Sequence, residues 1–287
     1  MRLFCWMVLL TGAYPFWRAW YLSRRTSLIQ AVHWSMVAWF GWTVALAFAD
    51  KWSGPAELQA CYLALCLTGC AGIAVLGARR PGMNAWNFVV VALLAMILLP
   101  LAEGYVRDRV VNPDPVRLVC IAATISFGII NYLPTRFAPA SILLLIGCTL
   151  EFIAISHPNH DDGPQRKTLQ LGWICLAFVP WLSYWCIRGE SPDLSEFDRR
   201  WLSFRNRFGF LWAERLRDQF NRSAAHANWP VVLRWQGLRV QKGSALPPSE
   251  EKIEMVKTLV ALMKRFGPET VAATAGDERS EAETPDG

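Results

Sequence analysis

Charged residues are scarce in the first two-thirds of this chain. The segment from Met1 to Ile187 holds 13 Lys/Arg and 8 Asp/Glu, whereas the last 100 residues hold 16 and 15. The whole chain has 287 residues and is 53% hydrophobic, and soluble domains are typically about 45–50% apolar. The uneven distribution, more than the total, argues against a single soluble domain. It predicts a lipid-embedded part followed by a polar part.

Other absences narrow the classes of function. The eight cysteines include no C-x-x-C pair and lie in or beside apolar segments, so we interpret them as packing residues. No repeat of 20–50 residues is evident, which does not favour the common inverted-repeat transporters. No motif names a reaction or a substrate, and no cofactor is predicted.

Seven apolar stretches fill most of the first 187 residues. They are 3–17, 27–49, 57–78, 84–102, 117–133, 140–156 and 169–187. Most approach or exceed the roughly 17–25 residues that a helix needs to cross a bilayer. The sequence therefore predicts an all-α polytopic membrane bundle of about seven transmembrane helices. The first stretch is short and contains Pro15, so we interpret it as an uncleaved anchor, with a re-entrant or interfacial helix as the alternative.

The basic residues of the loops alternate along the chain. If every stretch crosses, one side carries Arg18, Arg24, Arg25, Arg79, Arg80, Arg136 and Arg188. The loops on the opposite side have fewer basic residues, which are diluted by aspartates. Because Lys and Arg are enriched in cytoplasmic loops, the pattern predicts an outside N-terminus and a cytoplasmic C-terminus, in the cell (inner) membrane.

Two ionisable residues fall inside the apolar stretches. Glu151 lies near the predicted outer end of the sixth stretch, and His33 lies about two turns into the second. Ionisable groups in a span are costly, so each needs an explanation. Glu151 lies close to the bilayer surface, hydrogen-bonds a neighbouring helix, or lines the polar cavity of a small-solute transporter. For His33 we favour a packed, hydrogen-bonded side chain over a ligand.

A polar cluster follows the sixth stretch directly. His157, His160, Asp161 and Asp162 supply the imidazole and carboxylate ligands that zinc accepts. Their spacing matches no established metal signature, and an ordinary polar loop has the same composition. A membrane-embedded metal-dependent enzyme using this cluster is therefore an alternative hypothesis, and an enzyme is not the preferred one.

The chain after residue 190 has an amphipathic, basic character. Apolar residues at gaps of three and four, from Leu194 to Phe220, predict one continuous helix. Its opposite face carries the candidate residues for contact with a membrane surface or a partner: Arg199, Arg200, Arg205, Arg207 and Arg215. Anionic lipid and a protein partner both fit this charge. Nucleic acid is not expected, because no nucleic-acid-binding motif is present.

Two further elements complete a small α+β cytoplasmic module. Residues 229–240 alternate around a turn at Gln236-Gly237, which predicts a short hairpin. A second helix is expected from Ser249 to Phe266, with Ile253, Val256, Leu259, Val260 and Met263 inward. The predicted domains are a transmembrane domain (1–189), this module (190–268) and a disordered acidic tail (269–287). The preferred function is a non-enzymatic scaffold or accessory subunit of a membrane.

Overall fold

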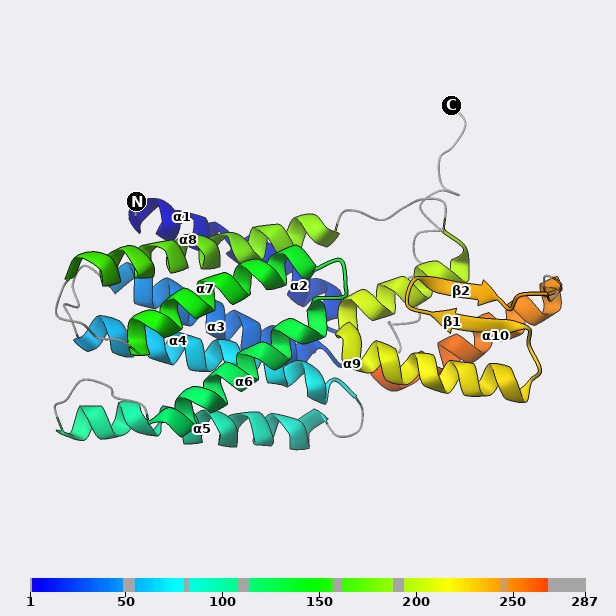
Figure 1. The fold of residues 1–287 in the computed structure, drawn as a ribbon, viewed down its shortest axis with the longest axis horizontal. Coiled ribbons are helices and arrows are strands. Elements are labelled where there is room, and N and C mark those ends of the chain that lie inside the picture. The colour runs from blue at the N-terminus through cyan, green and yellow to red at the C-terminus, as the bar shows by residue number, and fades with distance from the viewer. Residues whose placement is uncertain are drawn as a thin grey trace, which may run out of the picture. The chain divides into compact units, whose positions relative to one another are not determined.

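The computed structural model (Figure 1) describes residues 2–48, 55–79, 83–107, 114–156, 162–187, 194–243, 245 and 247–267. The contacts divide the chain into two compact units. The first contains Met1–Arg24 and Leu28–Gly189, and the second contains Arg25–Ser27 and Glu190–Gly287. The expected acidic tail lies outside the described residues.

The regular elements described in the first unit are all helical. Its elements are α1 (Arg2–Thr11), α2 (Ala13–Ser23), α3 (Ile29–Phe48), α4 (Pro55–Ala74), the 3-10 turn η1 (Val75–Gly77), α5 (Met83–Arg107), α6 (Pro115–Tyr132), α7 (Ala138–Ser156) and α8 (Asp162–Ile187). Five of these helices, α4 to α8, are long and apolar enough to cross a membrane. About seven transmembrane helices were expected, and five helices of the described residues meet the criteria of length and composition. Helices α1, α2 and α3 do not.

The first expected span is two short helices instead of one. Proline lacks the amide hydrogen of a helix interior and crowds the carbonyl four residues earlier, so Pro15 disfavours a continuous helix through Thr11. Helix α1 ends at Thr11 and α2 begins at Ala13, although Gly12 between them keeps helical angles, with φ −57° and ψ −16°. Trp39 of α3 contacts this junction, since its indole N–H donates to the Leu9 carbonyl at 2.8 Å.

Helix α4 forms the centre of the first unit and packs against α3, α5, α6 and α7. Of its apolar segment 67% is buried, compared with 17% for α5. The contact with α6 is close because a glycine stands on each side: a Cβ at Gly128 would lie 2.7 Å from the Gly72 Cα. Side chains also join the helices, since the Tyr62 hydroxyl donates to the Ile97 carbonyl at 2.6 Å. Small residues and buried polar bonds are the usual means of helix association in lipid.

The second unit contains α9 (Glu196–His226), β1 (Val231–Arg234), β2 (Gly237–Val240), α10 (Ser249–Met263) and the 3-10 turn η2 (Lys264–Phe266). Helix α9 is bent back on itself (Figure 1) at Gly209, where φ is 77° and ψ is −172°. Only glycine adopts this conformation without strain. In a straight helix Phe197 and Phe220 would be about 34 Å apart, yet their ring centroids are 5.1 Å apart. The prediction of one continuous helix is wrong, because α9 folds back at Gly209 and its apolar side chains pack against one another.

The predicted hairpin is confirmed, with its turn one residue earlier than expected. β1 and β2 are antiparallel with Arg234 opposite Gly237, so the turn is Trp235-Gln236. Asn221 of α9 holds the outer edge of β1. Its Oδ1 accepts from the Leu233 N–H at 2.7 Å, and its Nδ2 donates to the Leu233 carbonyl at 3.1 Å. A side-chain amide thus replaces a neighbouring strand.

Helix α10 and η2 cover the expected residues but present a different face. Met255, Leu259, Met263 and Phe266 are buried, whereas Ile253 is 56% exposed. The inward position expected for Ile253 is wrong. The buried set follows gaps of four, four and three residues, because the aromatic side chains of α9 determine which face of α10 is covered.

Residues 25–27 belong to the second unit although they lie between α2 and α3 in the chain. The backbone N–H and the hydroxyl of Ser27 both donate to the Phe266 carbonyl, at 3.0 and 2.9 Å. Gly267 follows with φ 126° and lies against this segment, since a Cβ there would be 3.0 Å from the Arg25 carbonyl oxygen. The segment therefore caps the end of η2.

Candidate functional site

Glu151 of α7 is the most unusual side chain of the first unit, because its exposed fraction is 0%. It lies against Gly172 of α8, where a Cβ would be 2.6 Å from Oε1. The missing side chain at position 172 makes the space that the carboxyl group occupies. Glu151 is thus enclosed between helices and is not directed outward from α7.

One further side chain, from α4, adjoins the carboxyl group, and a side chain from α8 adjoins that neighbour. The thiol of Cys61 is the polar neighbour of the carboxyl group, and the indole of Trp173 is a polar neighbour of the same thiol. Cys61 and Trp173 are 0% and 2% exposed. Within the described residues, neither oxygen of Glu151 has a partner in ordinary hydrogen-bond geometry. An unpaired ionised carboxylate is very costly in such surroundings.

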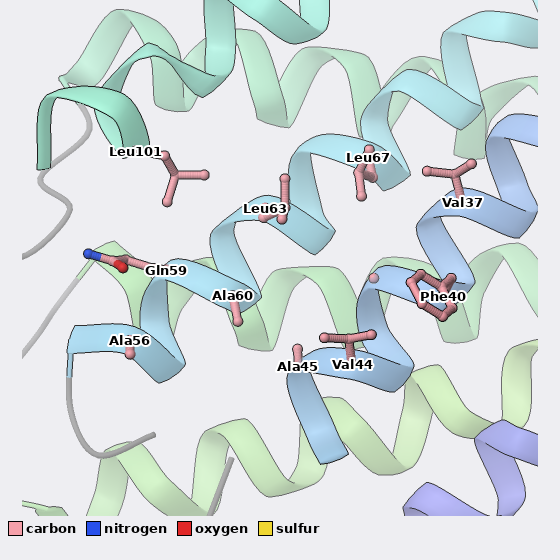
Figure 2. Close-up of a pocket in the computed structure, with 11 residues that line it drawn as sticks. Val37, Phe40, Val44, Ala45, Ala56, Gln59, Ala60, Leu63, Leu67 and Leu101 are labelled. Carbon is pink, nitrogen blue, oxygen red and sulfur yellow. The ribbon is translucent and has the colours of Figure 1, made fainter. Parts of the chain in front are cut away.

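A groove of about 510 Å³ lies between α3, α4 and α5 (Figure 2). Small residues form part of its wall, including Gly41 and Ala45 of α3 and Ala60 of α4, and Gln59 is the polar member of the lining set. Glu151 does not line this groove. The groove therefore offers mainly apolar contact. A molecule bound in it would not contact the carboxyl group of Glu151.

The arginines singled out in the second unit have different environments. Arg205 is a structural contact: it donates to the Trp235 carbonyl at 2.9 Å, and its guanidinium lies 5.2 Å from the Trp235 ring centroid. Arg200 pairs with Glu196 at 2.7 Å. Arg199 and Arg207 are half-buried, and Arg215 is exposed beside the Trp212 ring. The five arginines therefore do not form one uniform exposed face.

The remaining predicted site residues are not brought together by the described structure. His33 is exposed on α3, so the packed position expected for it is wrong. His157, His160 and Asp161 lie outside the described residues, and Asp162 is the first residue of α8. Among the residues that the structure does describe, no group of three or more His, Cys, Asp or Glu side chains could hold a metal ion.

Sequence reasoning missed the neighbours of Glu151 and the contact of residues 25–27. In the sequence, Cys61 and Trp173 look like ordinary residues of apolar segments. The residues beside them in the chain do not indicate that they lie near Glu151. Ser27 carried no signal either, because its partner Phe266 is 239 residues away in the chain.

Comparison with known protein families, with curated proteins and with solved structures finds no match for this chain.

Proposed function

We propose that this chain is a multi-pass integral membrane protein that acts as a scaffold or accessory subunit, with the second unit as its cytoplasmic recognition module. The observation that carries the proposal is the pairing of Ser27 with Phe266. This contact makes a short segment between α2 and α3 part of the basic and aromatic second unit.

The pairing supports a specific number of crossings. Residues 25–27 and the chain after Glu190 belong to one unit, so they lie on the same side of a membrane. The helices between them are α3 to α8, which are six. An even number of crossings returns the chain to the side from which it started, whereas the five long apolar helices alone would not. We infer that α3 also crosses: it has 20 residues and no charged side chain, and is about 30 Å long.

The distribution of arginine favours the cytoplasm for this side. Arg25 belongs to the segment that caps η2 and Arg24 directly precedes it, and residues 199–242 hold 10 basic and 2 acidic residues. Basic residues in short loops close to helix ends, such as Arg24 and Arg25, are retained on the cytoplasmic side during insertion, whereas the charge of a long domain has little effect on its translocation. The positive charge of residues 199–242 suits a module that contacts lipid headgroups or an acidic partner.

The aromatic core supports a recognition module that is folded and not a flexible tail. The ring centroid of Phe266 lies 4.9, 5.0 and 5.3 Å from those of Phe204, Phe208 and Trp212. Fully burying each such ring contributes about 1.5–3 kcal/mol. A small unit needs this density of buried aromatic surface to be stable.

Two measurements test the proposal. The full-length chain should stay in the membrane pellet after alkaline carbonate extraction, and a reporter fused after Gly287 should be active only in the cytoplasm. Deleting residues 193–266 should remove co-purifying proteins or change the lipids retained, while leaving the chain in the membrane. A chain that is recovered soluble without detergent would refute the membrane assignment. A deletion without effect on partners and lipids would refute the recognition role.

A further inference from the structure

We propose that one end of the second unit docks on the anionic headgroups of the membrane surface, with Phe210 inserted among the lipids. This end, the basic end, is formed by the bend of α9 and the end of α10 with η2. Phe210, Lys264 and Arg265 are exposed there, and Arg207 is half-buried. The proposal rests on the proposed function, because it requires the second unit to face a bilayer. It goes further by naming the ligand class and the surface.

Aromatic contacts bring the residues of the basic end together. Phe266, the last residue of η2, packs on Phe204 and Phe208, which directly precede the bend at Gly209. Lys264 and Arg265 stand one and two positions before Phe266 and are exposed. Phe210 stands one position after Gly209 and is 40% exposed. Lys264 and Arg265 therefore lie at the same end of the second unit as the bend of α9.

Charge is polarised along the second unit. Around the bend, residues 205–213 hold Arg205 and Arg207 and no acidic residue, whereas Arg200, farther from the bend, is paired with Glu196. The acidic residues of α10 lie in its N-terminal part, at Glu250, Glu251 and Glu254. The fifteen residues of α10 separate its two ends by about 22 Å, which exceeds the Debye length of about 8 Å at physiological ionic strength. The basic end therefore presents positive charge that the acidic end does not neutralise.

Phe210 is the apolar component of this surface. Its ring centroid lies 5.7 Å from that of Trp235, and the Arg205 guanidinium lies over the same indole. An exposed aromatic side chain at the same end of a unit as exposed basic residues is typical of surfaces that bind at the lipid headgroup level. The ring enters the apolar boundary, and the cations remain with the phosphates.

The chain itself holds the basic end near the bilayer. Ser27 is hydrogen-bonded to Phe266, and α3 begins at Ile29, two residues later. Two residues span at most about 7 Å. Since α3 is proposed to cross the membrane, the cap of η2 lies within a Debye length of the headgroup region. This tether favours lipid over a soluble protein as the occupant of the basic end.

The test places a spin label on the full-length chain in nanodiscs, with phosphatidylcholine alone or mixed with phosphatidylglycerol. The label replaces Phe210 (Phe210→Cys), and a label at Ile253→Cys is the matched control. Ile253 is also an exposed apolar residue of the second unit but lies near the acidic end of α10. Labelled wild-type protein gives the background from native cysteines. We expect the 210 label to become shielded from an aqueous relaxation agent only in the anionic discs, and the 253 label to stay accessible in both.

Charge variants test the electrostatic part. Lys264→Gln with Arg265→Gln should lower the ratio of docked to undocked protein about fivefold for each charge removed, or about 25-fold together. Lys242→Gln with Lys252→Gln removes the same charge from exposed positions away from the basic end and should change the ratio less than about twofold.

The outcomes separate the two proposals. Equal aqueous accessibility of the 210 label in both lipids, in protein that has incorporated into discs, would overturn lipid docking alone. Shielding only in native membranes would assign the surface to a protein partner and would also overturn it. Failure of the chain to incorporate into any disc would overturn the proposed function instead.

Discussion

The fit of Glu151 against Gly172 yields a quantitative prediction for the variant Gly172→Ala. The added Cβ would lie 2.6 Å from Oε1 and 3.2 Å from Cγ and Cδ of Glu151, whereas ordinary contacts between such atoms exceed about 3.4 Å. The side chain at 151 is enclosed, so either α7 and α8 separate or the carboxyl group turns into a poorer position. Overpacking of this kind costs about 1–3 kcal/mol.

The magnitude should depend on residue 151. In a Glu151→Ala background the three crowding atoms are absent, so adding Gly172→Ala should cost less than about 0.5 kcal/mol. The coupling free energy of the double-mutant cycle is then about 1–3 kcal/mol. The assay is unfolding of detergent-solubilised protein in a denaturing detergent, followed by tryptophan fluorescence.

A control variant lies on the same pair of helices. A Cβ at Gly147 would lie 2.8 Å from Cγ of Leu176, so Gly147→Ala also crowds the contact between α7 and α8 but not the carboxyl group. Its cost should be nearly the same with Glu or Ala at 151. If Gly172→Ala were equally destabilising in both backgrounds, the packing of the carboxyl group on Gly172 would be refuted.

Three further predictions concern the rest of the chain. Gly209→Ala should destabilise the second unit by about 1–3 kcal/mol, because φ is 77° there, and limited proteolysis should cleave the variant faster. Asn221→Ala should cost about 1–3 kcal/mol by removing both bonds to Leu233, with faster hydrogen exchange at the Leu233 amide. Purified protein should contain no stoichiometric zinc by elemental analysis, with His157 and His160 intact or replaced by alanine.

Each of these has a contradicting result. Unchanged proteolysis of the Gly209 variant would mean that the bend is not required. Unchanged exchange at Leu233 would mean that the Asn221 side chain does not hold the strand. Zinc that is present at one equivalent and lost with both histidines would favour the metal-dependent enzyme over the scaffold.

Local sequence pattern predicted the long helices well. The apolar runs at 57–78, 84–102, 117–133, 140–156 and 169–187 correspond to α4 to α8. Their length and lack of charge suffice, because a helix of such composition has few alternatives. Proline has a local effect too, and the break between α1 and α2 follows from Pro15.

The bend in α9 could not be predicted from the spacing of apolar residues. The spacing from Phe208 to Leu211 and Trp212 continues across Gly209 without interruption, so the pattern looks like one helix. A glycine with positive φ leaves no mark in the positions of its neighbours. The contacts that decide the bend, such as that of Phe197 with Phe220, are non-local.

The candidate sites could likewise be predicted from the sequence only in part. A lone carboxyl group in an apolar run marks Glu151, but Cys61 comes from another helix and its approach depends on packing. For the second unit, the sequence predicted one basic face that carries all five arginines. The structure differs, because Arg205 makes an internal contact with Trp235. Exposure depends on the fold, and composition alone does not determine it.

The sidedness of three positions tests the central claim most directly. Single cysteines replacing Arg25, Lys242 and Lys51 would be labelled in sealed vesicles with a membrane-impermeant maleimide. Positions 25 and 242 should react only from the cytoplasmic side, and position 51, one crossing of α3 away, only from the outside. Labelling of positions 25 and 242 from opposite sides would contradict the six-crossing arrangement and the pairing of Ser27 with Phe266 on which it depends.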